Sequence, residues 1–89
     1  MNDTTSTSRI KNMTKDELAS IAYSSVENLE WLEMNDGIRL GYHIYLYLMG
    51  TITSIEEAVL ESNSRTSLSH TQLISFIKER LSAAGIEAL

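Results

Sequence analysis

The sequence has no cysteine and no proline, and its seven lysine and arginine residues face twelve aspartate and glutamate residues. Without cysteine the chain can form neither a disulfide nor a thiolate metal site, and it has no thiol nucleophile. This composition fits a reducing, cytoplasmic location. The formal net charge of −5 argues against a protein that follows the phosphate backbone of a nucleic acid, because such a protein needs clustered lysine and arginine. We therefore expect no direct nucleic-acid partner.

Long hydrophobic segments are also lacking. The apolar stretch over residues 40–55 is shorter than the roughly 20 residues that a transmembrane helix needs, and it contains His43 and Gly50. Residues 1–12 are rich in serine, threonine and asparagine, and they lack the apolar core of a secretory signal. We predict that residues 1–12 are disordered, and we expect no contact with a membrane.

The central part of the chain, residues 38–60, carries the clearest pattern. Two sets of residues each recur every seven positions: Ile38, Tyr45, Ile52 and Val59, and Gly41, Leu48 and Ile55. This spacing is typical of a helix that packs lengthwise against other helices. Between residues 42 and 49 the other faces are apolar too, so we predict a helix over 38–61 at the centre of the domain or at a subunit interface. Alternating aromatic and branched residues over 43–48 also suit a strand, but no other segment offers it a partner.

The start of an earlier helix is marked by a capping box, in which Thr14 and Glu17 bond to each other's backbone, with Met13 and Leu18 placed as a hydrophobic staple. Apolar residues spaced three and four apart extend this helix, which we predict over 14–34. Residues 35–37 (Asn-Asp-Gly) are expected to end it, because they tolerate left-handed backbone angles. The same residues suit a turn between strands. Helical spacing on both sides favours a short corner between antiparallel helices.

A second capping box, Ser69 with Gln72, predicts a third helix over 69–84, with Gly85 after its end. We therefore predict an all-α fold: a long antiparallel helical hairpin plus a third packed helix, in one domain over residues 13–89. A chain of this length buries little more than about 60% of its unfolded surface, so we expect a small homodimeric bundle.

Aromatic and long apolar residues are the strongest candidates for a protein interface, because amphipathic aromatic side chains are favoured at interfaces. The candidate interface residues are Trp31, Tyr42, His43, Tyr45, Leu46, Tyr47 and Met49. For Tyr45, which lies on the seven-residue pattern, packing in the core is an equal alternative. The expected partner is a second copy of the chain or another protein.

Acidic residues gather on the predicted hairpin. The candidate acidic ridge consists of Glu27, Glu30, Glu33, Asp36, Glu56, Glu57 and Glu61. Such a ridge could imitate a phosphate backbone and block a protein that binds DNA or RNA. It could also hold a divalent cation, but di-iron bundles need Glu-x-x-His pairs and the sequence has none, so we predict no metal site.

Evidence for catalysis is weak. His43 and His70 are the side chains whose ordinary pKa lies nearest neutrality, and His43 is surrounded by tyrosines in the sequence. A proton relay through His43 is conceivable, but a buried or interfacial histidine is the simpler interpretation. No serine lies in a nucleophile elbow, and no glycine-rich loop could hold phosphate. We predict no enzyme activity and no cofactor.

The sequence therefore predicts a small, non-enzymatic, acidic helical protein that uses an aromatic-rich helix for self-association or for binding another protein. Its size, its acidic charge and its start rich in serine and threonine resemble accessory proteins of phages and other mobile elements. The alternative is an inhibitor that mimics nucleic acid through the acidic ridge.

Overall fold

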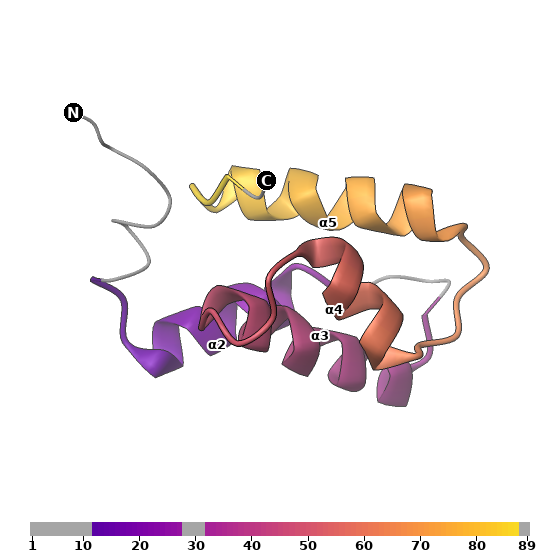
Figure 1. Cartoon of the computed structure of the whole chain (residues 1–89), viewed down its shortest axis with the longest axis horizontal. Coiled ribbons are helices and arrows are strands. Elements are labelled where there is room, and N and C mark those ends of the chain that lie inside the picture. The colour runs from indigo at the N-terminus through magenta and orange to yellow at the C-terminus, as the bar shows by residue number, and fades with distance from the viewer. Residues whose placement is uncertain (1–11, 28–31, 88–89) are drawn as a thin grey trace.

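A computed structural model describes residues 12–27 and 32–87. It contains four helices in these residues: α2 (Lys15–Ser24), α3 (Met34–Leu48), α4 (Ile55–Ser62) and α5 (His70–Ala83) (Figure 1). An isolated antiparallel bridge joins Leu32 to Thr66, and the described residues form no strand. The all-α prediction is confirmed, whereas the strand alternative for residues 43–48 is wrong because they lie within α3. The disorder predicted for residues 1–12 concerns residues that lie, except Asn12, outside the described part.

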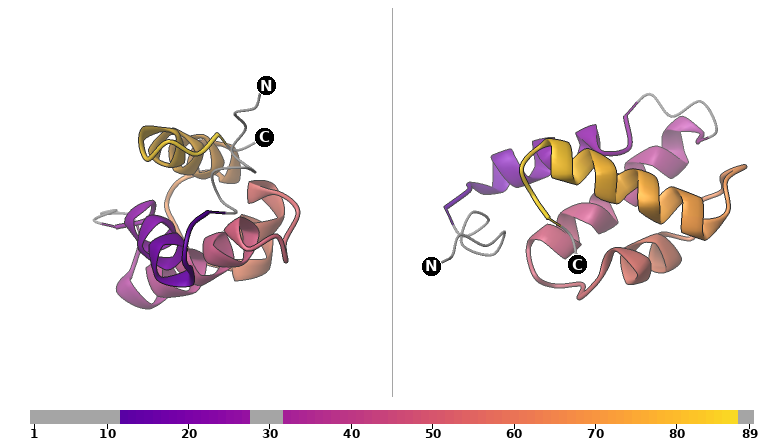
Figure 2. Two further views of the ribbon diagram at one scale, coloured as in Figure 1. Left: turned by 90° about the vertical axis from the view of Figure 1, so that its left-hand side faces the viewer. Right: turned by 90° about the horizontal axis from the view of Figure 1, so that it is seen from above.

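Three helices form a layer, and the fourth crosses it. Helix α3 lies in the middle of the layer, with α2 on one side and α4 on the other, and α5 covers one face of the layer (Figures 1 and 2). None of the helices in residues 12–27 and 32–87 combines the length and the apolar character that crossing a bilayer requires.

One face of every helix contributes to a common core. The buried apolar residues are Leu18 and Ala22 of α2, Leu40, Ile44 and Leu48 of α3, Ile55, Ala58 and Val59 of α4, and Leu73, Ile77 and Leu81 of α5, joined by Val26, Ile52 and Ile86 from the connections. Spacings of four residues in α2, α3 and α5, and of three and four residues in α4, bring these side chains onto one stripe of each helix, as expected for helices that pack on one side.

The three helix ends that were predicted from local capping residues are confirmed. The Thr14 hydroxyl accepts from the Glu17 backbone N–H at 3.1 Å, and the Glu17 carboxylate accepts from the Thr14 N–H at 2.8 Å. Ser69 and Gln72 form the same pair of bonds. At the end of α5, Gly85 has a φ of +89° and the Ile86 N–H donates to the Leu81 carbonyl at 2.8 Å. This is the Schellman geometry that a glycine after a helix favours.

The prediction of one helix over 14–34 is wrong, because α2 ends at Ser24. The Ser25 hydroxyl donates to the Ala22 carbonyl at 2.6 Å, a local bond that competes with helical continuation. The Arg80 guanidinium then donates to the carbonyls of Ser24 and Glu27, at 3.1 and 2.6 Å. Residues 35–37, predicted as a corner, belong instead to the beginning of α3.

The prediction of one helix over 38–61 is also wrong, which is why residues 12–27 and 32–87 contain four helices in place of the three predicted. Helix α3 ends in a second Schellman motif: Gly50 has a φ of +86°, and the Thr51 N–H donates to the Leu46 carbonyl at 2.9 Å. Helix α4 begins anew where the Ser54 hydroxyl accepts from the Glu57 N–H at 3.0 Å. The seven-residue pattern continues across this break because Ile52 and Ile55 reach the same core from a non-helical link and a new helix.

Candidate interaction face

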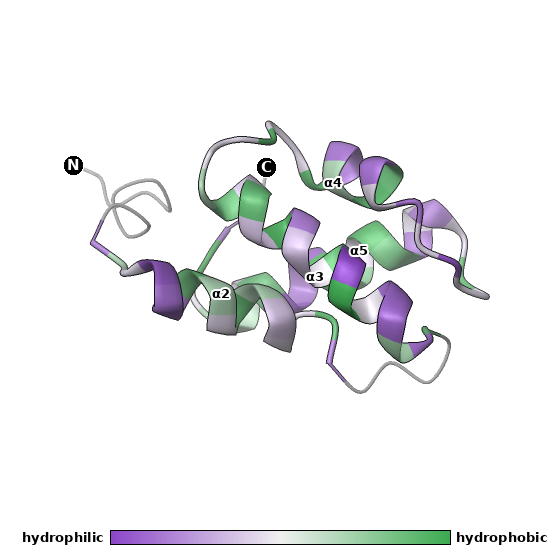
Figure 3. Ribbon diagram, turned by 90° about the horizontal axis from the view of Figure 1, so that it is seen from below, coloured by the Kyte–Doolittle hydropathy of each residue, from purple (hydrophilic) through white to green (hydrophobic). Residues whose placement is uncertain are grey.

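Helix α3 is apolar on the side that faces the core and also on the side that faces solvent. Its inward side buries Leu40, Ile44 and Leu48. On the other side large apolar residues remain exposed: Met34 by 78%, Ile38 by 53%, Tyr42 by 48% and Met49 by 39%. Their spacing of four, four and seven residues places them in one row along the helix. Figure 3 views the layer of α2, α3 and α4 from the side opposite α5.

Tyr23 of α2 widens this row. A Cβ atom at Gly41 would lie only 2.4 Å from Cδ1 of the Tyr23 ring, so the ring rests directly on the backbone of α3. A residue larger than glycine at position 41 would displace the ring. We call Tyr23, Met34, Ile38, Tyr42 and Met49 together the α3 face.

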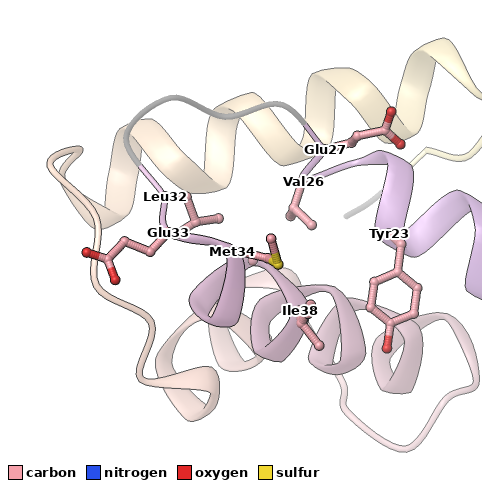
Figure 4. Close-up of a pocket in the computed structure, with 8 residues that line it drawn as sticks. Tyr23, Val26, Glu27, Leu32, Glu33, Met34 and Ile38 are labelled. Atoms are coloured by element: carbon pink, nitrogen blue, oxygen red, sulfur yellow. The ribbon is translucent and has the colours of Figure 1, made fainter.

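One end of the α3 face opens into a shallow groove of about 420 Å³. Figure 4 shows Tyr23 of α2 and Val26 from the turn that follows it and, across from them, Met34 and Ile38 from α3. Leu32, Gly37, Glu27 and Glu33 complete the lining. Trp31 and Glu30, which the sequence suggested for the interface and the acidic ridge, lie outside the described residues.

The aromatic residues predicted for the interface lie in or beside this face. The rings of Tyr42 and Tyr45 have centroids 6.4 Å apart, and the His43 ring meets Tyr42 edge-on at 5.7 Å. Nδ1 of His43 lies 2.8 Å from the Arg39 carbonyl, within bonding distance. His43, Tyr45, Leu46 and Tyr47 are half-buried, and the last three also pack against the core. Of the predicted set, Tyr42 and Met49 are therefore the most exposed described members.

Sequence reasoning missed Tyr23, Met34 and Ile38. In the sequence, Ile38 begins a seven-residue repeat that predicts packing against other helices, and Met34 is the last residue of the helix predicted over 14–34. The spacing of four from Met34 through Ile38 to Tyr42 was the signal for an outward row. It carries that meaning only once all three residues are assigned to the same helix.

None of the five residues of the α3 face is acidic, and carboxylates approach it only at the groove, where Glu27 and Glu33 lie. The sequence from residue 37 to 55 contains no aspartate or glutamate. Asp36, 5% exposed, forms an ion pair with Arg39 and accepts from the Arg65 backbone N–H at 3.2 Å. Its own carbonyl accepts from the Ser64 hydroxyl at 3.0 Å. Asp36 thus turns its charge toward the chain after α4. Arg39 is the one lysine or arginine between residues 37 and 48.

The other residues of the predicted acidic ridge are divided between two regions. Glu27 follows α2 and Glu33 directly precedes α3, without a capping bond from its side chain, whereas Glu56, Glu57 and Glu61 belong to α4. Helices α2 and α4 pack on opposite sides of α3 (Figure 2), but the bridge between Leu32 and Thr66 brings the start of α3 close to the chain that follows α4. Within the described residues, no three histidine or acidic side chains are grouped as metal ligands would be.

Two of these glutamates stabilise the beginning of α4. Hydrogen bonding to its own backbone N–H and to Lys78, whose Nζ lies 3.2 Å away, lowers the pKa of Glu56 below its usual value. The pKa of Glu57 is lowered by hydrogen bonds from the backbone N–H and the hydroxyl of Thr53. Carboxylates in the first turn also complement the positive end of the helix dipole.

Comparison with known proteins yields no match: no family model, no curated protein and no solved structure resembles the chain at a significant level.

Proposed function

We propose that this chain is a small interaction protein that works by binding rather than by catalysis, and that the α3 face joins it to a second copy of itself. The observation that carries the proposal is the double-sided apolar character of α3, whose inward residues fill the core while Met34, Ile38 and Tyr42 remain in water. Contiguous exposed apolar patches on the surface of a protein commonly mark sites of interaction with another molecule.

The size of the face supports a dimer. Taking about 200 Å² for a fully accessible large side chain, the exposed parts of its five residues offer roughly 500 Å². A specific interface buries about 800 Å² on each partner. The difference between these two areas can come from four further residues on the same side of α3: the half-buried Tyr45 and Leu46, and the exposed Asn35 and Arg39.

The charge of the face supports the same partner. Two copies with a formal charge of −5 each repel at a distance. None of the five residues of the α3 face carries a carboxylate. Burying these five residues in a contact therefore avoids the large free-energy cost of burying an unpaired anion. A partner protein of opposite charge would instead be expected to meet the acidic residues at the ends of α2 and α4.

The test is the solution mass by light scattering over a concentration series. We expect a dimer for the natural sequence and a monomer for Tyr42→Glu, because a charge would enter a desolvated contact. Leu60→Glu is the matched control, since Leu60 is also an exposed apolar residue but belongs to α4; this variant should remain a dimer. A natural protein that stays monomeric at the highest concentration overturns the proposal.

A further inference from the structure

We infer that the two copies pack their α3 helices antiparallel, with Tyr42 of each copy at the two-fold axis. This inference rests on the proposed function and specifies the partner's orientation. Closed two-fold dimers use the same patch on both copies. The exposed row runs from Met34 to Met49, and Tyr42 is the exposed residue nearest its midpoint. A two-fold axis at Tyr42 therefore lets the α3 helices of the two copies cover the whole exposed row of each other.

The antiparallel register brings different residues of the row together. With Tyr42 facing its copy, Ile38 lies opposite Leu46 of the second copy, and Asn35 lies opposite Met49. The Tyr23 ring, held against Gly41, borders the axis and adds to an aromatic centre. Interfaces concentrate their binding energy in central aromatic residues that are shielded from water, and this arrangement supplies such a centre.

Arg39, which borders the α3 face and is paired with Asp36 of its own helix, favours one of the two orientations. In a parallel pair, Arg39 would lie beside Arg39 of the second copy, and the positive ends of both α3 dipoles would be adjacent. Both juxtapositions are repulsive. In the antiparallel pair, Arg39 lies opposite Tyr45 of the second copy, and a guanidinium over a tyrosine ring is attractive. The helix dipoles then run in opposite directions.

A shorter antiparallel register, centred on Ile38, is the nearest competitor. It would pair Met34 with Tyr42 of the second copy and would leave Leu46 and Met49 outside the contact. Neither the exposed part of Met49 nor the half-exposed Leu46 would then meet α3 of the second copy. The register about Tyr42 removes more apolar surface from water, which is the main favourable term in association.

The absence of cysteine allows a direct test, because a single introduced cysteine is then the only thiol. We would introduce Tyr42→Cys, Ile38→Cys or Met34→Cys and follow disulfide-linked dimer during mild oxidation. About the Tyr42 axis, the two thiols of a Met34→Cys dimer lie roughly 24 Å apart along the helix pair, beyond the reach of a disulfide. We expect Tyr42→Cys to link about ten times faster than Met34→Cys. Leu60→Cys measures linking by random collision.

A mixed pair protects the test against a weakened Tyr42→Cys dimer. Ile38→Cys combined with Leu46→Cys should give a linked heterodimer in which Tyr42 is intact. Equal linking at positions 34, 38 and 42 would show a parallel pair, and fastest linking of Ile38→Cys with itself would show the shorter register; either result overturns the inference. If the reduced proteins are dimers by light scattering but none of these cysteines links faster than Leu60→Cys, the inference falls while self-association stands. If the natural protein is a monomer, the proposed function itself falls.

Discussion

The guanidinium of Arg80 joins the last turn of α5 to the end of α2, and its removal is the sharpest test of how the fold is held together. One of its nitrogens donates to the carbonyls of Ser24 and Glu27, at 3.1 and 2.6 Å. The guanidinium carbon lies 4.6 Å from the centre of the Phe76 ring. The carbonyls at the end of α2 form the negative end of its dipole, so the arginine charge is favourable there.

The expected cost of Arg80→Met follows from these contacts. A hydrogen bond to a charged group contributes about 1.5–3 kcal/mol when buried, and partial exposure reduces this value. For two such bonds and the dipole term we expect a loss of about 2 kcal/mol in the free energy of unfolding. For a domain of this size that corresponds to a fall in Tm of about 10 °C.

The assay is urea unfolding followed by circular dichroism at one fixed protein concentration, because self-association would otherwise change the apparent stability. Arg80→Lys keeps the charge but not the planar fork and should lose about half as much. Lys78→Met is the matched control. It also removes a cation from α5, but Lys78 forms only a surface ion pair with Glu56, so the expected loss of stability is small. If Arg80→Met proves no more harmful than Lys78→Met, the bonds to the end of α2 contribute nothing of note.

Three further outcomes are expected. Gly50→Ala should cost about 1 kcal/mol, because position 50 requires a left-handed φ, whereas Gly37→Ala, inside α3 with room for a methyl group, should be neutral or stabilising in the same urea assay. Raising the salt concentration from low to molar should strengthen the dimer roughly fivefold by screening the repulsion between two acidic copies; weakening would contradict a contact without carboxylates. Because the pKa values of Glu56 and Glu57 lie below the ordinary 4.5, their stabilisation is complete above that pH and is lost as the pH falls through the lowered values. Glu57→Gln should therefore flatten the loss of stability between about pH 5 and 3, and an unchanged slope would refute this assignment.

Local chemistry in the sequence was enough to predict three helix ends. The capping boxes at Thr14 and Ser69 and the glycine at 85 each involve groups within five residues of one another. The break between α3 and α4 carried similar signals, Gly50 followed by Ser54 and Glu57. They were outweighed by a seven-residue pattern that continues across the break, because periodicity reports which residues are buried and not whether the backbone between them is helical.

Contacts between distant residues explain what the sequence could not predict. The bonds from Arg80 to the end of α2 cross more than 50 residues of sequence. Asp36 belonged to the predicted acidic ridge, yet it is buried because the backbone of Arg65, 29 residues later, donates to its carboxylate. For the interaction face, the aromatic content of α3 was visible in the sequence, whereas the exposure of Ile38 follows from which side of α3 packs on α2 and α4.

The position of α5 has a consequence for the order in which the fold can form. Leu73, Ile77 and Leu81 are completely buried against the layer of the other three helices. A ribosome releases α2, α3 and α4 before α5, so a nascent chain of this protein first displays the uncovered apolar side of that layer together with the outward row on α3. Until α5 is added, such an intermediate is apolar on two sides, and exposed apolar surface of this kind promotes misassociation. Copies that meet before α5 is released can pair through the wrong side.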